Sequence, residues 1–443
     1  MRKKCLAAVL MAVCVLSGCA ESTVRGEERI DAEVMSEEQV AAESKVEEVM
    51  ESRTQITDEN KANADCDYDA LNAFSYRLFR ENMEEENPVI SPISAYIALS
   101  MVGMGAQNNT KEEFASVLGD DSAITAICDA IMTTLPTSSD NTTVTLANSV
   151  WVDDSFTIYD NWLAEIVSIM HSEVFHTELS APDVVGNVNE WVNRNTNGLI
   201  ENMVDQPFDG NTNLVLFNTI YFKAKWESSF EPEAVYEDSF YPEGGNELKT
   251  QIMHKQSEME YVSNEFAEGV ILPYKSIEEE DGNFSFVALK PMDADKTVRD
   301  LYSDLTDGGI EEMLENRQMM QVNLKLPKFE IDFDRELNRS LESMGLKSAF
   351  DAANADFGGI GENSLGQSQN KLYIDLVRQK AKIIVDEEGT EAAASTGIMM
   401  RFAAAGPQEV RDVWFDRPFV YMIMDMDKEI PLFIGIFDNP AAL

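Results

Sequence analysis

The sequence has few of the residues on which metal-dependent and nucleophilic catalysis depend. Its three histidines stand neither in an HExxH motif nor beside a pair of cysteines, so the usual ligands of a zinc site are missing. A GxSxG elbow and a GxxxxGKS/T phosphate loop are absent, and the nearest approach to GxGxxG, at Gly103 and Gly105, lacks the third glycine. Carboxylate pairs are frequent, but no spacing singles one out for acid–base catalysis. We therefore expect no metal, no other cofactor and no enzymatic activity.

Basic residues are also scarce. The 443-residue chain has 34 Lys and Arg residues against 80 Asp and Glu residues, which gives a formal net charge of -46. A surface this acidic repels polyphosphates, sulfated polysaccharides and anionic lipid headgroups. We expect no binding to nucleic acid or to heparin-like polyanions, and no electrostatic docking to membranes. The hydrophobic fraction of 44% is nevertheless sufficient for a large folded core.

The N-terminus contains a targeting signal. Residues 1–18 combine a basic start, MRKK, with an apolar run from Cys5 to Leu16 that is too short to span a bilayer. The residues Leu16 to Cys19, LSGC, resemble a bacterial lipobox, in which the cysteine thiol is lipidated and becomes the mature N-terminus. We expect export and lipid anchoring through Cys19, with the domain on the extracellular side of the bacterial cell membrane. The alternative is an ordinary secretory signal with an incidental cysteine.

An acidic segment without aromatic residues follows the signal. Residues 19–67 contain no Phe, Tyr or Trp, and between Ala20 and Asp67 fifteen acidic residues stand against five basic ones. This composition is typical of a flexible, self-repelling tether. Cys66 and Cys128 are the cysteines that remain beyond Cys19, and their spacing permits one disulfide. A core of this size does not need it, so we expect both to be unpaired.

Periodic hydrophobic patterns begin at Tyr68 and continue to the C-terminus, which predicts one domain over residues 68–443. Helical spacing predicts helices, and extended apolar or alternating runs predict strands. We predict a first helix that begins near Tyr68 and further helices over Ile93–Met104, Asp183–Arg194 and Asp334–Met344. The predicted strands cover Thr143–Val152, Leu214–Ala224, Phe284–Leu289 and Gln321–Leu326. Helices and strands alternate without a regular repeat, which indicates a mixed α+β fold.

The segment from Asp386 to Ala405, DEEGTEAAASTGIMMRFAAA, fits neither a loop rich in turn formers nor a strand chosen by propensity. Its first part, EEGTEAAASTG, resembles the proximal hinge of the reactive loop in inhibitory serpins. Further blocks resemble serpin segments in the family's own order. These blocks are Ser91–Phe114 for the helix B region, Leu214–Phe230 for the central strand and breach, Leu326–Asp332 for a sheet A strand, Val413–Ile423 for the family signature and Pro431–Pro440 for the C-terminal strand.

On this resemblance the chain is identified as a member of the serpin family. The resemblance implies a large central sheet A, two further sheets, eight or nine helices and an exposed reactive-centre loop. It also implies suicide inhibition of serine endopeptidases: the protease cleaves the loop, is trapped as an acyl-enzyme, and the loop inserts into sheet A as a new strand. The implied partner is a serine protease in a covalent complex, and we expect the inhibitor itself to be a monomer. The alternative is a non-inhibitory serpin with a binding or chaperone-like role.

The hinge residues implied by the resemblance are small or uncharged where insertion would bury them. Alternation along a strand sends one set of residues to the same face: Thr390, Ala392, Ala394, Thr396 and Ile398. A charge on that face would oppose insertion, and non-inhibitory serpins typically carry such obstacles. The complete predicted hinge comprises Glu387, Glu388, Gly389, Thr390, Glu391, Ala392, Ala393, Ala394, Ser395 and Thr396.

The resemblance also assigns polar and aromatic residues around the place where the loop enters sheet A. In the shutter, Gln379 takes the place of the family's usual histidine. An amide still donates and accepts hydrogen bonds, but it lacks the pH response of histidine. The other assigned residues are Ser91, Ser94 and Asn218 in the shutter and Trp226 in the breach, where Lys328 and Glu387 match the family's ion pair.

The resemblance places the scissile bond sixteen residues beyond Glu387, which gives Ala403, with Ala404 after the bond. A small residue suits proteases with a shallow primary pocket, such as elastase-like enzymes. The stretch that follows Ala404 is longer than in many relatives, so two neighbouring positions stay open. Cleavage after Phe402 would invite chymotrypsin-like proteases, and cleavage after Arg401 would invite trypsin-like ones.

Overall fold

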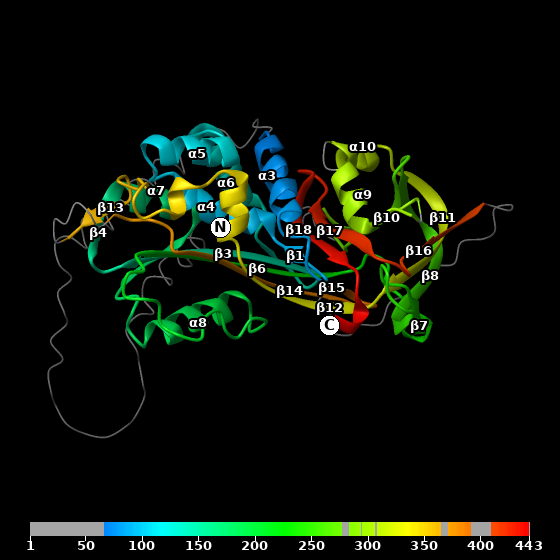
Figure 1. Ribbon diagram of the computed structural model, residues 1–443. Coiled ribbons are helices and arrows are strands. Elements are labelled where there is room, and N and C mark those ends of the chain that lie inside the picture. The colour runs from blue at the N-terminus through cyan, green and yellow to red at the C-terminus, as the bar shows by residue number, and fades with distance from the viewer. Residues whose placement is uncertain are drawn as a thin grey trace, which may run out of the picture. The chain divides into compact units, whose positions relative to one another are not determined.

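The computed structural model describes residues 66–276, 283–293, 295–305, 308–364, 371–390 and 409–442. Within these ranges the chain forms nine α-helices, in agreement with the eight or nine expected (Figure 1). The helices are α3 (Asp69–Arg80), α4 (Pro92–Gly103), α5 (Asn108–Leu118), α6 (Asp121–Thr134), α7 (Asp160–Met170), α8 (Val184–Asn195), α9 (Val298–Leu305), α10 (Gly309–Glu315) and α11 (Asn338–Met344), with 3-10 turns η1 (Pro232–Ala234), η3 (Ser348–Phe350) and η4 (Pro440–Ala442).

A seven-stranded sheet corresponds to the expected sheet A, and its strand order is β12-β14-β15-β6-β3-β2 with β5 beside β3. The strands are β2 (Thr137–Ser138), β3 (Thr142–Asp153), β5 (Glu173–Thr177), β6 (Leu214–Lys225), β12 (Phe329–Glu336), β14 (Leu376–Val385) and β15 (Gly389–Thr390). Strand β14 runs parallel to β6, whereas β12 is antiparallel to β14 and β3 is antiparallel to β6. A strand placed between β14 and β6 can therefore be antiparallel to both.

The second large sheet has nine strands in the order β1-β18-β17-β10-β9-β8-β11-β16, with β7 beside β8, and a small sheet pairs β13 with β4. The two further sheets expected from the family are joined into one ladder here, because the long strand β8 pairs with β7 and β11 and, at its end, with β9. These strands are β1 (Val89–Ile90), β4 (Phe156–Ile158), β7 (Val235–Phe240), β8 (Leu248–Ser263), β9 (Ala267–Pro273), β10 (Phe284–Pro291), β11 (Gln318–Pro327), β13 (Gly361–Asn363), β16 (Val410–Trp414), β17 (Phe419–Asp425) and β18 (Ile430–Phe437).

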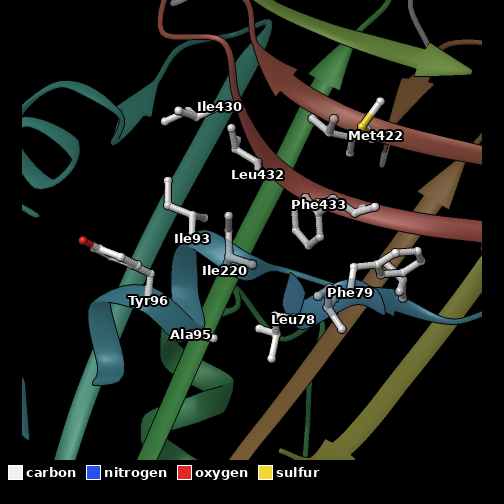
Figure 2. Packing of buried hydrophobic residues seen from close by; sticks show 14 of the residues in the cluster. Leu78, Phe79, Ile93, Ala95, Tyr96, Ile220, Met422, Ile430, Leu432 and Phe433 are labelled. Carbon is white, nitrogen blue, oxygen red and sulfur yellow. The ribbon is translucent and has the colours of Figure 1, made fainter. Parts of the chain in front are cut away.

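Helix α4 lies at the centre of the main core. All of its residues are buried, as expected for a helix that is apolar on every side. It packs against α3, against β3 and β6 of sheet A, and against β18 of the second sheet. Figure 2 shows Ile93 of α4, Ile220 of β6 and Leu432 of β18 gathered in this core. Because α4 begins directly after Ser91, the same packing positions that residue next to sheet A.

Helix α8 covers the other face of sheet A (Figure 1). Its Val188 and Trp191 form a second buried cluster with Trp151 of β3 and Phe217 of β6. Side chains of β6 therefore alternate between two buried environments, because Ile220 belongs to the main core and Phe217 to the α8 cluster. Any strand added beside β6 has its side chains sorted in the same way.

The predicted elements agree with the structure within a few residues, except that the first part of the helix predicted over Asp334–Met344 is wrong. Strand β12 takes up the first residues of this range, and α11 begins only at Asn338. The cause is pairing with β14: the Asp334 carboxylate forms ion pairs with Arg378 at 2.7 Å and with Lys380 at 3.0 Å. Such cross-strand pairs stabilise the extended backbone, and the local sequence does not reveal them.

Cys66 and Cys128 carry free thiols, as expected, and Cys128 is buried in the core. Among the helices of the described residues, none is long and apolar enough to cross a membrane.

Candidate functional site

Sheet A is open between β6 and β14 over part of their length. At one end the two strands pair directly, between Leu376–Gln379 and Val215–Asn218. At the other end β15 lies between them and pairs with both. In the described part of the chain, residues 380–384 of β14 and 219–223 of β6 have no strand pairing with each other. Strand edges without a partner readily accept a further strand, so the sheet can receive one here.

Two residues of the predicted hinge, Gly389 and Thr390, form β15. Thr390 lies opposite both Val385 and Ala224, and its side chain is 1% exposed. Its hydroxyl shares a hydrogen bond of 2.6 Å with the hydroxyl of Tyr274. A Cβ added to Gly389 would lie 2.1 Å from the carbonyl oxygen of Ala224, so the close approach of the two backbones requires glycine.

Trp226 follows β6 directly and holds Asp386 and the start of the hinge. Its backbone N–H donates to the carbonyl oxygen of Glu388 at 2.9 Å, and its indole Nε1 donates to the carbonyl oxygen of Asp386 at 2.8 Å. The backbone N–H of Phe230 donates to the carbonyl oxygen of Glu387 at 2.9 Å. Three consecutive carbonyl groups are thus held by one turn, which fixes the point at which the hinge enters sheet A.

Lys328 and Glu387 form an ion pair with an Nζ to Oε2 distance of 2.6 Å. Burial raises the pKa of Glu387, but hydrogen bonding to Lys328 and to the backbone, together with the Lys328 charge, outweighs burial and holds this pKa below its ordinary value. Burial has the opposite net result at Asp386, whose pKa is raised although its carboxylate accepts hydrogen bonds from the backbone N–H groups of Glu388 and Gly389.

Ser91 and Gln379 form two reciprocal hydrogen bonds in the interior. The backbone N–H of Ser91 donates to Oε1 of Gln379 at 2.9 Å, and Nε2 of Gln379 donates to the carbonyl oxygen of Ser91 at 2.8 Å. The Ser91 hydroxyl donates to the hydroxyl of Ser94 at 3.1 Å. The amide therefore connects the start of α4 to the last residue of β14 that pairs with β6 before the opening.

Asn218 of β6 lies opposite Gln379 on one side and opposite Asn148 of β3 on the other. Nδ2 of Asn218 donates to Oδ1 of Asn148. The remaining amide atoms, Oδ1 of Asn218 and Nδ2 of Asn148, are buried and have no hydrogen-bond partner among the described residues. Buried amide atoms without partners destabilise their surroundings. The closed end of the opening is therefore a polar and incompletely satisfied junction.

Sequence reasoning misses two residues of this site, Tyr274 and Asn148. Tyr274 stacks on Trp226 with ring centroids 4.7 Å apart, but it follows an unrelated strand and nothing in its local sequence indicates contact with the hinge. Asn148 and Ser149 interrupt the apolar residues from Leu146 to Val152 of strand β3, and this polar interruption is a signal that could have identified Asn148.

Several predicted site residues lie outside the described residues. These are the hinge residues Glu391 to Thr396, the scissile positions Arg401 to Ala404 and the lipidation site Cys19.

Comparison with known proteins agrees with this architecture. A family model described as "Serpin (serine protease inhibitor)" matches residues 69–440. Serpin-Z2B from Triticum aestivum is 30% identical, with 83% of this chain and 94% of that protein covered. Neuroserpin from Mus musculus is 29% identical, with 83% and 90% covered. The crystal structure of the thermophilic serpin Tengpin in the native state has 31% identity and a TM-score of 0.76, with 84% of this chain and 93% of that chain covered.

The family match spans nearly all of the folded sequence, and the expected α+β fold with its large central sheet is confirmed. Proteins of this family are generally protease inhibitors. The chain belongs to the serpin family.

Proposed function

We propose that this chain is a suicide inhibitor of serine endopeptidases, most suited to elastase-like enzymes. The observation that carries the proposal is the opening in sheet A beside the seated hinge. Thr390 already pairs with both β6 and β14, Gly389 pairs with β6, and in the described part of the chain residues 219–223 and 380–384 of the two strands are unpaired with each other. Trapping a protease requires that the cleaved loop becomes a strand before the acyl-enzyme is hydrolysed. An opening that exists before cleavage favours rapid insertion, and so does a start of the loop, at Thr390, that is already paired with both strands.

The register of β15 indicates how far the loop can insert without breaking any pairing. Thr390 lies opposite Ala224 of β6. Continued in the same register, an antiparallel strand would place residues 391–395 opposite residues 223–219. These residues match the unpaired stretch of β6, so the first part of the hinge would fill the opening.

Insertion beyond residue 395 would meet the closed end of the opening. Thr396 would arrive opposite Asn218, which at present pairs with Gln379. The unsatisfied amide atoms of Asn218 and Asn148 lower the cost of separating the strands there, because the closed junction leaves hydrogen bonds unmade. An inserted threonine hydroxyl is able to provide a partner.

The side chains of the hinge suit the environments that this register gives them. Ala392 would lie opposite Phe222 on the face of the main core, where a small residue next to a large one preserves close packing. Glu391 would lie opposite Lys223 on the α8 side, where opposite charges form a favourable cross-strand pair. A charged side chain at position 391 is therefore compatible with insertion, whereas a charged side chain at position 392 is not.

In the proposed reaction the protease serine attacks the carbonyl carbon of Ala403. The bond to Ala404 breaks, the released amine takes up a proton, and Ala403 stays attached to the protease as an ester. Insertion of the loop then carries the ester and the attached protease along sheet A before water hydrolyses the ester. Cleavage after Phe402 or Arg401 would keep this mechanism and change the target to chymotrypsin-like or trypsin-like proteases.

A denaturing gel tests the proposed function. We expect incubation with an elastase-like protease to produce a complex that survives boiling in SDS, because the ester is covalent. A non-inhibitory serpin would produce only cleaved chain. Absence of such a complex with elastase-like, chymotrypsin-like and trypsin-like proteases alike would contradict the inhibitory function.

We further propose that residues 19–67 tether the domain to the extracellular side of a bacterial cell membrane after removal of residues 1–18. The support is the LSGC sequence before an acidic segment without aromatic residues. Cys19→Ala should release the protein from membranes and leave complex formation with proteases unchanged. A variant that still sediments with membranes would contradict anchoring through Cys19.

A further inference from the structure

A pocket of about 470 Å³ lies on the α8 side of sheet A, over the paired strands β3 and β6. Its lining includes Lys223 and Lys225 of β6, Thr143 and Thr145 of β3, and Arg194 near the end of α8. We call it the Lys223 pocket. Hydroxyl and amide side chains supply most of the remaining lining, so the pocket is hydrophilic.

Lys223 and Lys225 lie on the same face of β6, because strand residues two positions apart share a face. Their Cα atoms are about 7 Å apart at the usual rise of a strand, so both ammonium groups can reach one ligand. Thr143 lies directly opposite Lys223 on β3, and its hydroxyl is on the same face. Two cations and a hydroxyl group are therefore available to a single small molecule.

No described side chain compensates the charge of these two lysines. Lys223 and Lys225 are partly buried, and among the described residues their ammonium groups have neither a hydrogen bond nor an ion pair. The chain has 80 acidic residues, and a lysine across the opening of sheet A does have such a partner: Lys380 of β14 is paired with Asp334 at 3.0 Å. An anionic ligand would supply the counter-charge that β6 lacks.

The other charged groups of the pocket limit the kind of anion that fits. Arg194 is already paired with Glu173, with an Nη2 to Oε2 distance of 3.0 Å. Among the described residues that line the pocket, Asp140 alone carries a carboxylate, and it is exposed. The lining is therefore positive within a chain whose net charge is -46. A small anion fits this lining, whereas a polyanion would extend onto the acidic surface and be repelled.

We propose that the Lys223 pocket binds a small hydroxylated phosphate ester of the sugar phosphate class, with the phosphate group between Lys223 and Lys225. A dianionic phosphate group matches two neighbouring ammonium groups in charge and accepts hydrogen bonds from both. The Thr143 hydroxyl is able to donate a further hydrogen bond, and the amide and hydroxyl side chains of the lining suit the hydroxyl groups of the ester. The scarcity of apolar side chains in the lining disfavours ligands with a hydrocarbon body.

Binding at Lys223 would oppose loop insertion. This consequence rests on the proposed inhibitory function, whereas the binding itself does not. Continued in the register of β15, an inserted Glu391 would lie opposite Lys223. Its carboxylate would compete with the phosphate group for the same ammonium group. A ligand that binds the intact form better than the inserted form shifts the equilibrium towards the intact form by the same factor.

Calorimetric titration of the intact protein with glucose 6-phosphate tests the binding. We expect one equivalent to bind saturably, and glucose, which lacks the phosphate group, to bind at least about tenfold more weakly. Lys223→Gln and Lys225→Gln should each weaken binding of the ester by about tenfold, the loss expected for a charge-assisted hydrogen bond. Lys347→Gln removes one positive charge at an exposed lysine outside the pocket and should leave the affinity unchanged. No saturable binding, or equal affinity in the wild type and both pocket variants, would overturn the site.

The same titration of the loop-cleaved protein tests the coupling to insertion. Glucose 6-phosphate should bind the cleaved wild type several-fold more weakly than the intact wild type, and Glu391→Ala should restore the intact affinity in the cleaved form. Equal affinity of the intact and cleaved wild type would overturn the coupling. An intact protein that binds the ester and never forms a covalent protease complex would retain this site and lose the proposed inhibitory function, so the two failures are distinguishable.

Discussion

Thr390 and Tyr274, 116 positions apart in the chain, share a hydrogen bond of 2.6 Å between their hydroxyl groups in the protein interior. Tyr274 also stacks on Trp226, whose indole Nε1 holds the carbonyl group of Asp386. The first residues of the hinge are therefore seated by specific side chains as well as by strand pairing. The site that holds the Thr390 side chain has little free space, because Thr390 is almost fully buried.

This enclosure predicts that Thr390→Arg converts the chain from an inhibitor into a substrate. The guanidinium would have to occupy the buried position beside Tyr274, which costs several kcal/mol and delays insertion beyond hydrolysis of the acyl-enzyme. The fraction of protease captured in SDS-stable complex should fall by about tenfold or more. Thr390→Ser keeps the hydroxyl and is the matched control, with complex formation retained. Undiminished capture by the arginine variant would show that the buried position of Thr390 is not required for insertion.

The sequence predicts those parts of the fold that local pattern controls. Helix α4 is apolar on all sides, and its burial follows directly from this pattern. The helical pattern places the start of α11 too early, because cross-strand ion pairs of Asp334 extend strand β12. In the site, the resemblance to serpins predicts the ion pair between Lys328 and Glu387, and the structure places Nζ of Lys328 2.6 Å from Oε2 of Glu387. Tyr274 reaches Thr390 only through the arrangement of separate sheets, and no local pattern encodes that contact.

The reciprocal bonds between Ser91 and Gln379 predict a stability effect at the shutter. Gln379→Leu should lower the free energy of unfolding by about 1–3 kcal/mol, because the buried Ser91 N–H loses its acceptor. The Ser91 carbonyl group keeps a bond from the N–H of Ala95 at 3.3 Å, which limits the loss. Denaturant titration measures the effect, and an unchanged unfolding midpoint would contradict the assigned role of the amide.

Gln379→His is the companion variant for pH. A neutral imidazole at this buried position can accept the Ser91 N–H, and burial disfavours its protonated form, so its pKa in the folded state should lie below the unfolded value. The variant should then lose stability as the pH falls below about 6.5, while the wild-type amide adds no such dependence.

The ion pair between Lys328 and Glu387 predicts a second pH dependence. Because the pKa of Glu387 is held below its ordinary value of 4.5 in the folded state, the stabilisation is present above that pH and is lost as the pH falls through the lowered pKa. Lys328→Met should therefore destabilise the protein at neutral pH, by about 1 kcal/mol or less because both side chains are partly exposed. The thermal unfolding temperatures of the two proteins should converge as the pH falls through the lowered pKa of Glu387, and a difference that stays constant from neutral to strongly acidic pH would contradict the assignment.

Specificity should follow the residue before the scissile bond. Ala403→Arg should shift complex formation from elastase-like to trypsin-like proteases, because a deep pocket ending in a carboxylate favours a paired guanidinium. Mass spectrometry of the peptide released from the wild-type complex identifies the bond directly. Release beginning at Ala404 is expected. Release beginning one or two residues earlier would reassign the bond to Phe402 or Arg401 and leave the inhibitor class intact.

The central claim is that the loop inserts between β6 and β14, and thermal unfolding before and after cleavage of the loop tests it most directly. Cleavage frees the residues beyond Thr390 to pair with the open edges of both strands. We predict that the cleaved protein unfolds several degrees above the intact protein, because each kcal/mol of added strand pairing raises the unfolding temperature of a domain this large by about 1 °C, and that Thr390→Arg reduces this difference. Equal unfolding temperatures for intact and cleaved wild-type protein would contradict insertion.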